Sequence, residues 1–204
     1  MARAHASNRF GYQLECSNLA CCRMLNMRSL ISELRLFVAN HYVNFLPSHR
    51  LRKLYYCKVM KFKIGSGSSI HLGCRFDAAL GLEIGCDSTI NDFCVLDTRA
   101  GIRIGNNVTL GSGVWLITAS HDINTPTFVG ITSPIKIGDY AFVGRRATVL
   151  LGCDLGVGAV LGAGSVLTKS IPDYEIWAGN PARKIGTRAC KQFIYNCRYD
   201  RAFH

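Results

Sequence analysis

"IGDYAFVGRRATVLLGCDLGVGAVLGAGSVLTKSIP", residues 137–172, is the stretch that decides the fold. Read in sixes, every unit opens on an aliphatic residue, and a small residue usually stands four places later. A period of six fits neither the 3.6-residue period of a helix nor the two-residue alternation of a long strand. It predicts short strands joined by tight corners, with one aliphatic side chain on each side pointing inward.

The same unit runs through the earlier part of the chain. Ile64, Ile84 and Ile104 each open a set of three units and lie twenty residues apart, which is three hexapeptides plus a two-residue corner insertion. The sequence therefore predicts an all-β solenoid, a parallel β-helix whose turns stack through backbone hydrogen bonds. Because 33 residues separate Ile104 from Ile137, the third turn is expected to extrude a loop at about 117–134.

The basic charge of the chain is concentrated at its two ends. Residues 1–63 carry eleven Lys/Arg against two Asp/Glu, residues 64–172 carry seven against eight, and residues 173–204 carry six against three. We expect these to be a basic, amphipathic N-terminal helical region, the β-helix domain and a short C-terminal extension. No nucleic-acid-binding motif accompanies the charge, so nucleic acid is not an expected partner.

Helical spacing of apolar residues marks the segment before Pro47. The apolar positions are Leu30, Ile31, Leu34, Phe37, Val38, Tyr42 and Phe45. Charged residues interrupt the run, so a membrane-spanning helix is excluded. We expect a helical cap over the first turn, because the end of a solenoid otherwise exposes unpaired backbone. Peripheral contact with an anionic membrane is the alternative.

The chain has ten cysteines but no apolar run typical of a secretory leader. Cys74, Cys94 and Cys153 occupy the small-residue position of the repeat, which predicts buried thiols in a reducing cytoplasm. The inner face of a membrane is the alternative location. No Cys-x-x-Cys pair is present, so no metal site is expected.

Two segments carry a resemblance to a known family: "ASHDI" at 119–123 and the long run from "SPIKIGDY" to "AGNPARKI" at 133–185. They resemble the hexapeptide-repeat acyltransferases, closest to the sugar O-acetyltransferases of the galactoside, maltose, capsule and colanic-acid type. The resemblance covers residues 64–188. It implies left-handed coiling, acetyl-CoA as acyl donor and a homotrimer. General rules would favour the right hand for parallel crossovers.

His121 matches the general base of this family, which stands on the extruded loop. An acceptor hydroxyl must lose its proton as it attacks a thioester carbonyl, and a neutral imidazole can accept that proton near pH 7. The resemblance implies direct transfer without an acyl-enzyme. Asp122 either orients the His121 ring or caps the loop, and the sequence leaves both open.

The resemblance also implies a site for the developing oxyanion. Gly144 and Arg145 match the corner whose backbone N–H groups are donors in the family. A serine often stands where this chain has Arg145, so a hydroxyl contact is lost, and the arginine side chain is instead a candidate for a CoA phosphate.

The remaining cofactor positions follow from "GAGSVLTK" and "AGNPARK". Ala163 and Gly164 match positions where the pantetheine arm lies close to the backbone. Thr168, Lys169 and Arg183 match contacts to the nucleotide end of CoA. Glycines at the corners of a coil are expected with or without a cofactor, so this evidence depends on the whole motif.

Asn91 matches an asparagine on the acceptor side of the family's site, although an asparagine ladder at a coil corner explains it equally well. Asn91 lies seven residues after the turn start at Ile84, and His121 lies seventeen after Ile104. These offsets predict different corners, so one substrate could meet both residues only at an interface between subunits.

The function expected from the sequence is acetyl-CoA-dependent O-acetylation of a sugar hydroxyl, in the biosynthesis of a surface polysaccharide or its precursor. N-acetylation of an amino sugar and a non-catalytic β-helix scaffold are the alternatives. A γ-type carbonic anhydrase needs three histidines on zinc, and only His71 and His121 lie in the repeat. This function therefore fails on the number of ligands.

Overall fold

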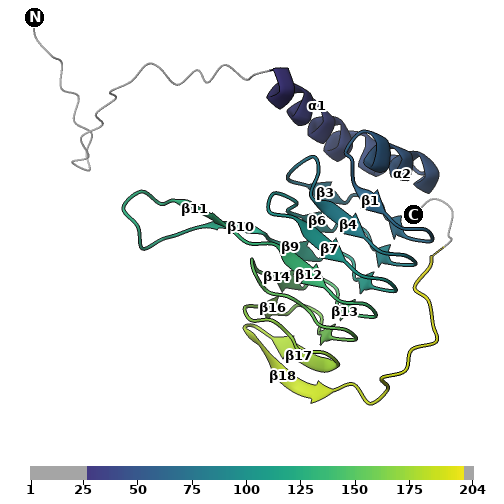
Figure 1. The fold of residues 1–204 in the computed structure, drawn as a ribbon, viewed down its shortest axis with the longest axis vertical. Helices are drawn as coiled ribbons and strands as arrows, with labels where there is room; N and C mark the ends of the chain where they lie inside the picture. The colour runs from purple at the N-terminus through teal and green to yellow at the C-terminus, as the bar shows by residue number, and fades with distance from the viewer. Residues whose placement is uncertain (1–26, 200–204) are drawn as a thin grey trace, which may run out of the picture.

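The structure is a computed structural model that describes residues 27–199. Residues 1–26 of the predicted N-terminal region and 200–204 of the predicted extension lie outside the described residues. Figure 1 shows a β-solenoid with helices across its first turn, a two-stranded arm projecting from its middle and a C-terminal strand pair at its far end. The predicted architecture, a left-handed parallel β-helix with an N-terminal helical cap, is confirmed.

Three sheets form the sides of the solenoid, and their strands are parallel except for the last pair, β17 and β18, which is antiparallel. Sheet A contains β1 (Lys63–Ile64), β4 (Leu82–Ile84), β7 (Ile102–Ile104) and β12 (Ile135–Ile137). Sheet B contains β2 (Ser69–Ile70), β5 (Thr89–Ile90), β8 (Thr109–Leu110), β13 (Phe142–Val143), β15 (Val160–Leu161), β17 (Glu175–Gly179) and β18 (Ala182–Thr187). Sheet C contains β3 (Arg75–Phe76), β6 (Val95–Leu96), β9 (Trp115–Leu116), β14 (Thr148–Val149) and β16 (Val166–Leu167).

The core is built from the aliphatic residues that open the hexapeptides. Ile84 and Ile104 pair in register on neighbouring turns, and both side chains are buried. Cys74, Cys94 and Cys153 are buried free thiols, as their repeat position predicts. Burial of an aliphatic side chain contributes roughly 1.5–3 kcal/mol, so one such residue per side stabilises every turn.

Three helices cover the first turn: α1 (Met27–His41), the 3-10 helix η1 (Val43–Phe45) and α2 (His49–Lys58). The Asn40 side chain satisfies both backbone groups of Phe76 on the edge strand β3, through bonds of 2.7 and 3.0 Å. Arg52, which is buried on α2, donates through Nε to the carbonyl of Ile70 on β2 at 3.3 Å. The helices therefore cap the unpaired backbone at the end of the solenoid.

The segment between β9 and β12 leaves the solenoid as an arm, over the residues where the interrupted repeat predicts a loop (Figure 1). It is a hairpin of β10 (Ala119–His121) and β11 (Gly130–Thr132), antiparallel, with His121 opposite Gly130. Parallel stacking also continues past residue 172, because β17 pairs with β15. The predicted boundary at residue 172 therefore falls within the stack.

Residues 188–199 form a strap that runs back along the solenoid towards the helices, as the yellow trace in Figure 1 shows. Arg188 donates to the carbonyl of Tyr140 at 3.0 Å, and the Thr89 hydroxyl donates to the carbonyl of Cys197 at 2.6 Å. Within residues 27–199, no helix is long and apolar enough to cross a membrane.

Candidate active site

A buried carboxylate holds the base of the hairpin arm. Asp97 follows β6 on the preceding turn, and its Oδ2 accepts from the backbone N–H of Thr118 at 3.0 Å. Arg99 donates to both oxygens of the same carboxylate, at 2.7 and 2.9 Å. Burial alone would raise the pKa of Asp97, but the hydrogen bonds from Arg99 and Thr118 outweigh it and hold that pKa below its ordinary value.

His121 lies on β10 with its ring fixed by the opposite side of the hairpin. Its Nδ1 is 2.9 Å from the carbonyl oxygen of Phe128. Because a carbonyl can only accept, Nδ1 carries the hydrogen and Nε2 is left with a free lone pair in the neutral ring. The Phe128 ring stacks on the imidazole with centroids 4.3 Å apart and planes 6° from parallel. In its neutral form the exposed His121 ring can therefore accept a proton at Nε2.

Asp122 has the loop-capping geometry rather than a contact to the His121 ring. Its Oδ1 accepts from the backbone N–H of Asn124 at 2.9 Å, and its carbonyl accepts from the Thr125 hydroxyl at 3.0 Å. Of the two roles that the sequence left open, this local turn is the one that the contacts support. The acceptor that orients His121 is the Phe128 carbonyl.

A groove of about 760 Å³ runs down the corner where each turn passes from sheet B to sheet C. Its lining comes from four successive turns: Phe93, Ser112, Gly113, Arg145, Arg146, Ala163 and Gly164. Three of the predicted cofactor residues therefore share one surface. A Cβ added at Gly164 would meet nothing within 4 Å, so the backbone there is open to a ligand.

The predicted oxyanion donors need a correction at Gly144. Its N–H donates to the carbonyl of Leu161 on the next turn at 2.7 Å, so it is not available to a substrate. A Cβ at Gly144 would lie 2.4 Å from the Ala163 nitrogen, which explains why glycine is required where the turns stack so closely. Within residues 27–199 the N–H of Arg145 forms no hydrogen bond, and it remains the candidate donor.

The three residues assigned to the nucleotide end are not gathered in the groove. Thr168 and Lys169 are exposed and follow β16, at the corner between sheets C and A. Arg183 lies on β18 opposite Ala178. Ala178 in turn packs against Gly162, since a Cβ added to Gly162 would lie 2.8 Å from the Ala178 Cβ. Arg183 therefore lies at the C-terminal end of the groove's corner, whereas Thr168 and Lys169 lie on the next corner.

Asn91 lies at the N-terminal end of the groove's corner, directly after β5. Its amide nitrogen donates to the carbonyl of Leu110 on the next turn at 2.7 Å, so it does serve as a link between turns. The hairpin that carries His121 leaves from the corner between sheets C and A. The two residues thus occupy different corners of one chain, as their offsets predict.

Two residues that position the site were not predicted from the sequence. Phe128 is seven residues from His121 and meets it only because the hairpin folds back, and no motif marks it. Asp97 lies twenty-one residues before Thr118, and one turn of the coil brings them together. The available signal was the coil period itself, which places residues about twenty apart on adjacent turns.

Comparison with known proteins supports the repeat and the fold. Residues 134–169 match the family described as "Hexapeptide repeat of succinyl-transferase". A Schizosaccharomyces pombe protein, provisionally named an acetyltransferase, is 41% identical over 85 residues, which are 39% of this chain and 40% of that protein. A Saccharomyces cerevisiae protein with the same kind of name is 33% identical over 82 residues, 39% of this chain and 42% of that protein. The chain thus spans about two fifths of these relatives.

Solved structures match over more of the chain. The maltose O-acetyltransferase from Clostridium difficile 630 has a TM-score of 0.67 at 26% identity, covering 76% of this chain and 83% of that one. A hexapeptide-repeat acetyltransferase of Vibrio cholerae, solved with acetyl coenzyme A, has a TM-score of 0.73 at 22% identity, covering 79% and 90%. Repeat, sheet register and these likenesses together show that the chain has the left-handed β-helix fold of the hexapeptide-repeat acetyltransferases.

Proposed function

We propose that the protein is an acetyl-CoA-dependent O-acetyltransferase that acts on a sugar hydroxyl, with His121 as general base. The observation that carries this proposal is the hydrogen bond from Nδ1 to the Phe128 carbonyl, which leaves Nε2 to accept a proton. The likeness to a maltose O-acetyltransferase and to two proteins named as acetyltransferases supports the acyl donor and the acceptor class.

In the proposed reaction the acceptor oxygen attacks the thioester carbonyl of acetyl-CoA while Nε2 of His121 removes its proton. The carbonyl oxygen becomes an oxyanion, for which the N–H of Arg145 is the available donor. Collapse breaks the carbon–sulfur bond, and the imidazolium returns the proton to the thiolate of CoA. Proton transfer of this kind contributes about 10² to 10⁴ in rate.

The corner groove is the proposed binding site for the donor. Its open backbone at Ala163 and Gly164 suits an extended pantetheine arm, and Arg145 and Arg146 suit phosphate. Arg183, with Lys169 and Thr168, is proposed for the nucleotide end. The last two lie on another corner, so they would serve a donor bound between two subunits.

We further propose a homotrimer in which one subunit supplies His121 and its neighbour supplies Asn91 and the groove. Sheet C and the adjoining corner support an interface, because Trp115 is 51% and Phe93 62% exposed in the single chain. Large exposed aromatic residues are typical of interfaces between proteins. Surface-polysaccharide biosynthesis in the cytoplasm is the proposed setting, as predicted from the sequence.

The test of the proposed mechanism is His121→Ala, with Ser120→Ala on the same exposed strand as control. We expect turnover of acetyl-CoA with a sugar acceptor to fall at least about 10²-fold in His121→Ala, and to stay near the wild-type value in the control. Binding of acetyl-CoA, measured by calorimetry, should be unchanged in both.

Analysis of the product from paired hydroxy and amino sugars separates O- from N-acetylation. Wild-type turnover in His121→Ala would disprove the role of the histidine. If the wild-type protein binds acetyl-CoA but transfers the acetyl group to no sugar, the proposed acceptor class is wrong.

A further inference from the structure

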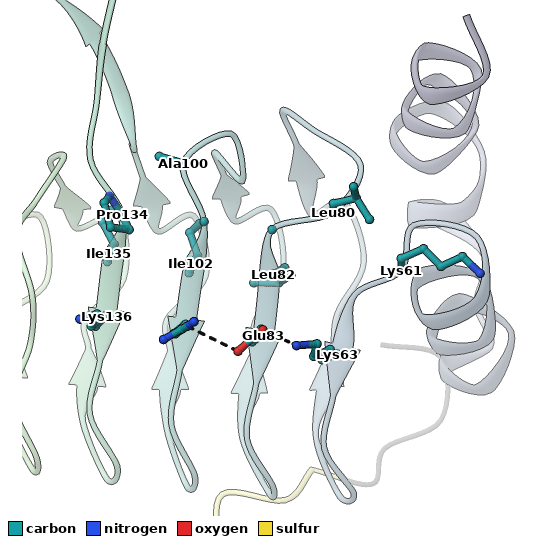
Figure 2. Close-up of a pocket in the computed structure, with 13 residues that line it drawn as sticks. Lys61, Lys63, Leu80, Leu82, Glu83, Ala100, Ile102, Pro134, Ile135 and Lys136 are labelled. Carbon is teal, nitrogen blue, oxygen red and sulfur yellow. Dashed lines mark hydrogen bonds and ion pairs between the residues drawn. The ribbon is translucent and has the colours of Figure 1, made fainter. Parts of the chain in front are cut away.

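The outer face of sheet A is hollowed into a groove of about 490 Å³, separate from the corner groove (Figure 2). Its floor is a row of charged side chains, one from each of the first four turns: Lys63, Glu83, Arg103 and Lys136. Neighbouring strands of a sheet lie about 4.8 Å apart, so the row places a charge at that interval along the solenoid.

The charges in this row do not balance. Glu83 accepts a hydrogen bond from the Lys63 ammonium at 2.7 Å and lies 3.5 Å from Arg103 Nε. The bond from Lys63 holds the pKa of the Glu83 carboxyl below its ordinary value, so the carboxylate is charged near pH 7. Three cations therefore share one carboxylate.

Arg103 and Lys136 stand directly opposite each other in the register of β7 and β12. Like charges at such positions destabilise a sheet. In the part of the chain that the structure describes, the Lys136 ammonium forms no ion pair, and the nearby Asp154 carboxylate is bonded to the Lys136 backbone N–H at 2.8 Å. An anion bound between the two cations would relieve this repulsion.

The rim of the groove gives the class of ligand. Leu80, Ala100 and Pro134 line it at the corner from which the hairpin arm leaves (Figure 2). Aliphatic side chains beside a charged floor suit the C–H face of a sugar ring that bears an acidic group. Among residues 27–199, no aromatic side chain lines the groove to provide the stacking surfaces on which binding of single-stranded nucleic acid depends.

From this geometry we propose that the outer face of sheet A binds the anionic part of an acidic glycan, beside the arm that carries His121. The inference rests on the proposed function, of which it specifies the acceptor: a carboxylate- or phosphate-bearing saccharide chain rather than a neutral sugar. The saccharide lies across successive turns of the solenoid, with its acidic groups at Arg103 and Lys136.

The experiment measures binding of oligogalacturonate, and of a neutral maltooligosaccharide of equal length, to the full chain without acetyl-CoA. We expect the variant Arg103→Gln/Lys136→Gln to weaken oligogalacturonate binding at least about 10-fold, as loss of two charged hydrogen-bond donors should. The matched control is Arg50→Gln/Lys58→Gln, which removes the same charge from exposed positions on α2. It should bind within twofold of the wild type.

If both double variants weaken oligogalacturonate binding equally, the effect is due to net charge alone, and the proposed site is wrong. Tighter binding of single-stranded DNA of the same charge would overturn the glycan assignment, as would equal affinity for the neutral oligosaccharide. Because binding is measured without the donor, these outcomes are independent of whether acetyl transfer is detected. If the protein acetylates only neutral sugars but still binds oligogalacturonate at sheet A, the anion site stands and its assignment to the acceptor is rejected.

Discussion

At the scale of single residues, the contact between His121 and Phe128 determines what the histidine can do. The backbone carbonyl of Phe128 selects the tautomer, and its ring limits rotation of the imidazole. A backbone acceptor survives any substitution of the side chain. The two contributions of Phe128 can therefore be separated experimentally.

Replacement of Phe128 by alanine keeps the carbonyl and removes the stacked ring. We expect kcat to fall about 10-fold because the base is less well positioned, while KM for acetyl-CoA and the melting temperature stay unchanged. Phe128→Tyr, which retains a ring, should restore kcat. Steady-state kinetics with Ile123→Ala as control, an exposed apolar residue of the same arm, checks this. A change confined to KM would assign Phe128 to substrate binding instead.

At the scale of elements, the hairpin arm depends on Asp97. Removing this carboxylate leaves the buried Thr118 N–H without an acceptor, which costs about 1–3 kcal/mol. We expect Asp97→Ala to lower the free energy of unfolding by that amount. It should also lower kcat, because the hairpin that carries His121 is held less firmly where it leaves the solenoid. Urea denaturation and kinetics on the folded variant provide the two measurements.

Asp139→Ala is the matched control for Asp97, since the Asp139 carboxylate accepts from the Asn106 N–H at 2.8 Å on a corner without the arm. It should cost stability but leave kcat unchanged. The stability that Asp97 contributes also has a defined pH dependence. The folded-state pKa is depressed, so the contribution is present above the unfolded-state pKa and is lost as pH falls through the folded value. An equal difference at all acidic pH values would contradict this.

The elements also show where sequence reasoning succeeds. The six-residue period fixes which residues point inward, because each strand has room for one, and the spacing from Ile104 to Ile137 locates the arm. The role of the Gly144 N–H was not predictable in the same way. Whether a corner N–H is free depends on the vertical alignment of two turns, and the repeat alone does not specify that alignment.

At the scale of the whole molecule, the separation of Asn91 and His121 onto two corners predicts complementation. His121→Ala and Asn91→Ala are each expected to be nearly inactive. When the two are co-expressed and mix at random, a site is complete only if each mutant supplies its intact residue. About a quarter of wild-type activity should then return.

Activity of the purified mixed assemblies, with subunit composition determined by native mass spectrometry, tests this. Co-expression of His121→Ala with itself under a second tag is the control. Mixed trimers without recovered activity would place both residues in one subunit or limit Asn91 to its bond with Leu110.

The strap of residues 188–199 affects how the molecule comes apart. In an open solenoid each turn touches only its neighbours, so the stack can fray from either end one turn at a time. Here the strap fastens late turns to early ones, down to the first turn, where the rings of Tyr199 and His71 lie 4.9 Å apart. We therefore expect that neither end unwinds alone, and that the solenoid unfolds with the all-or-none cooperativity of a globular domain.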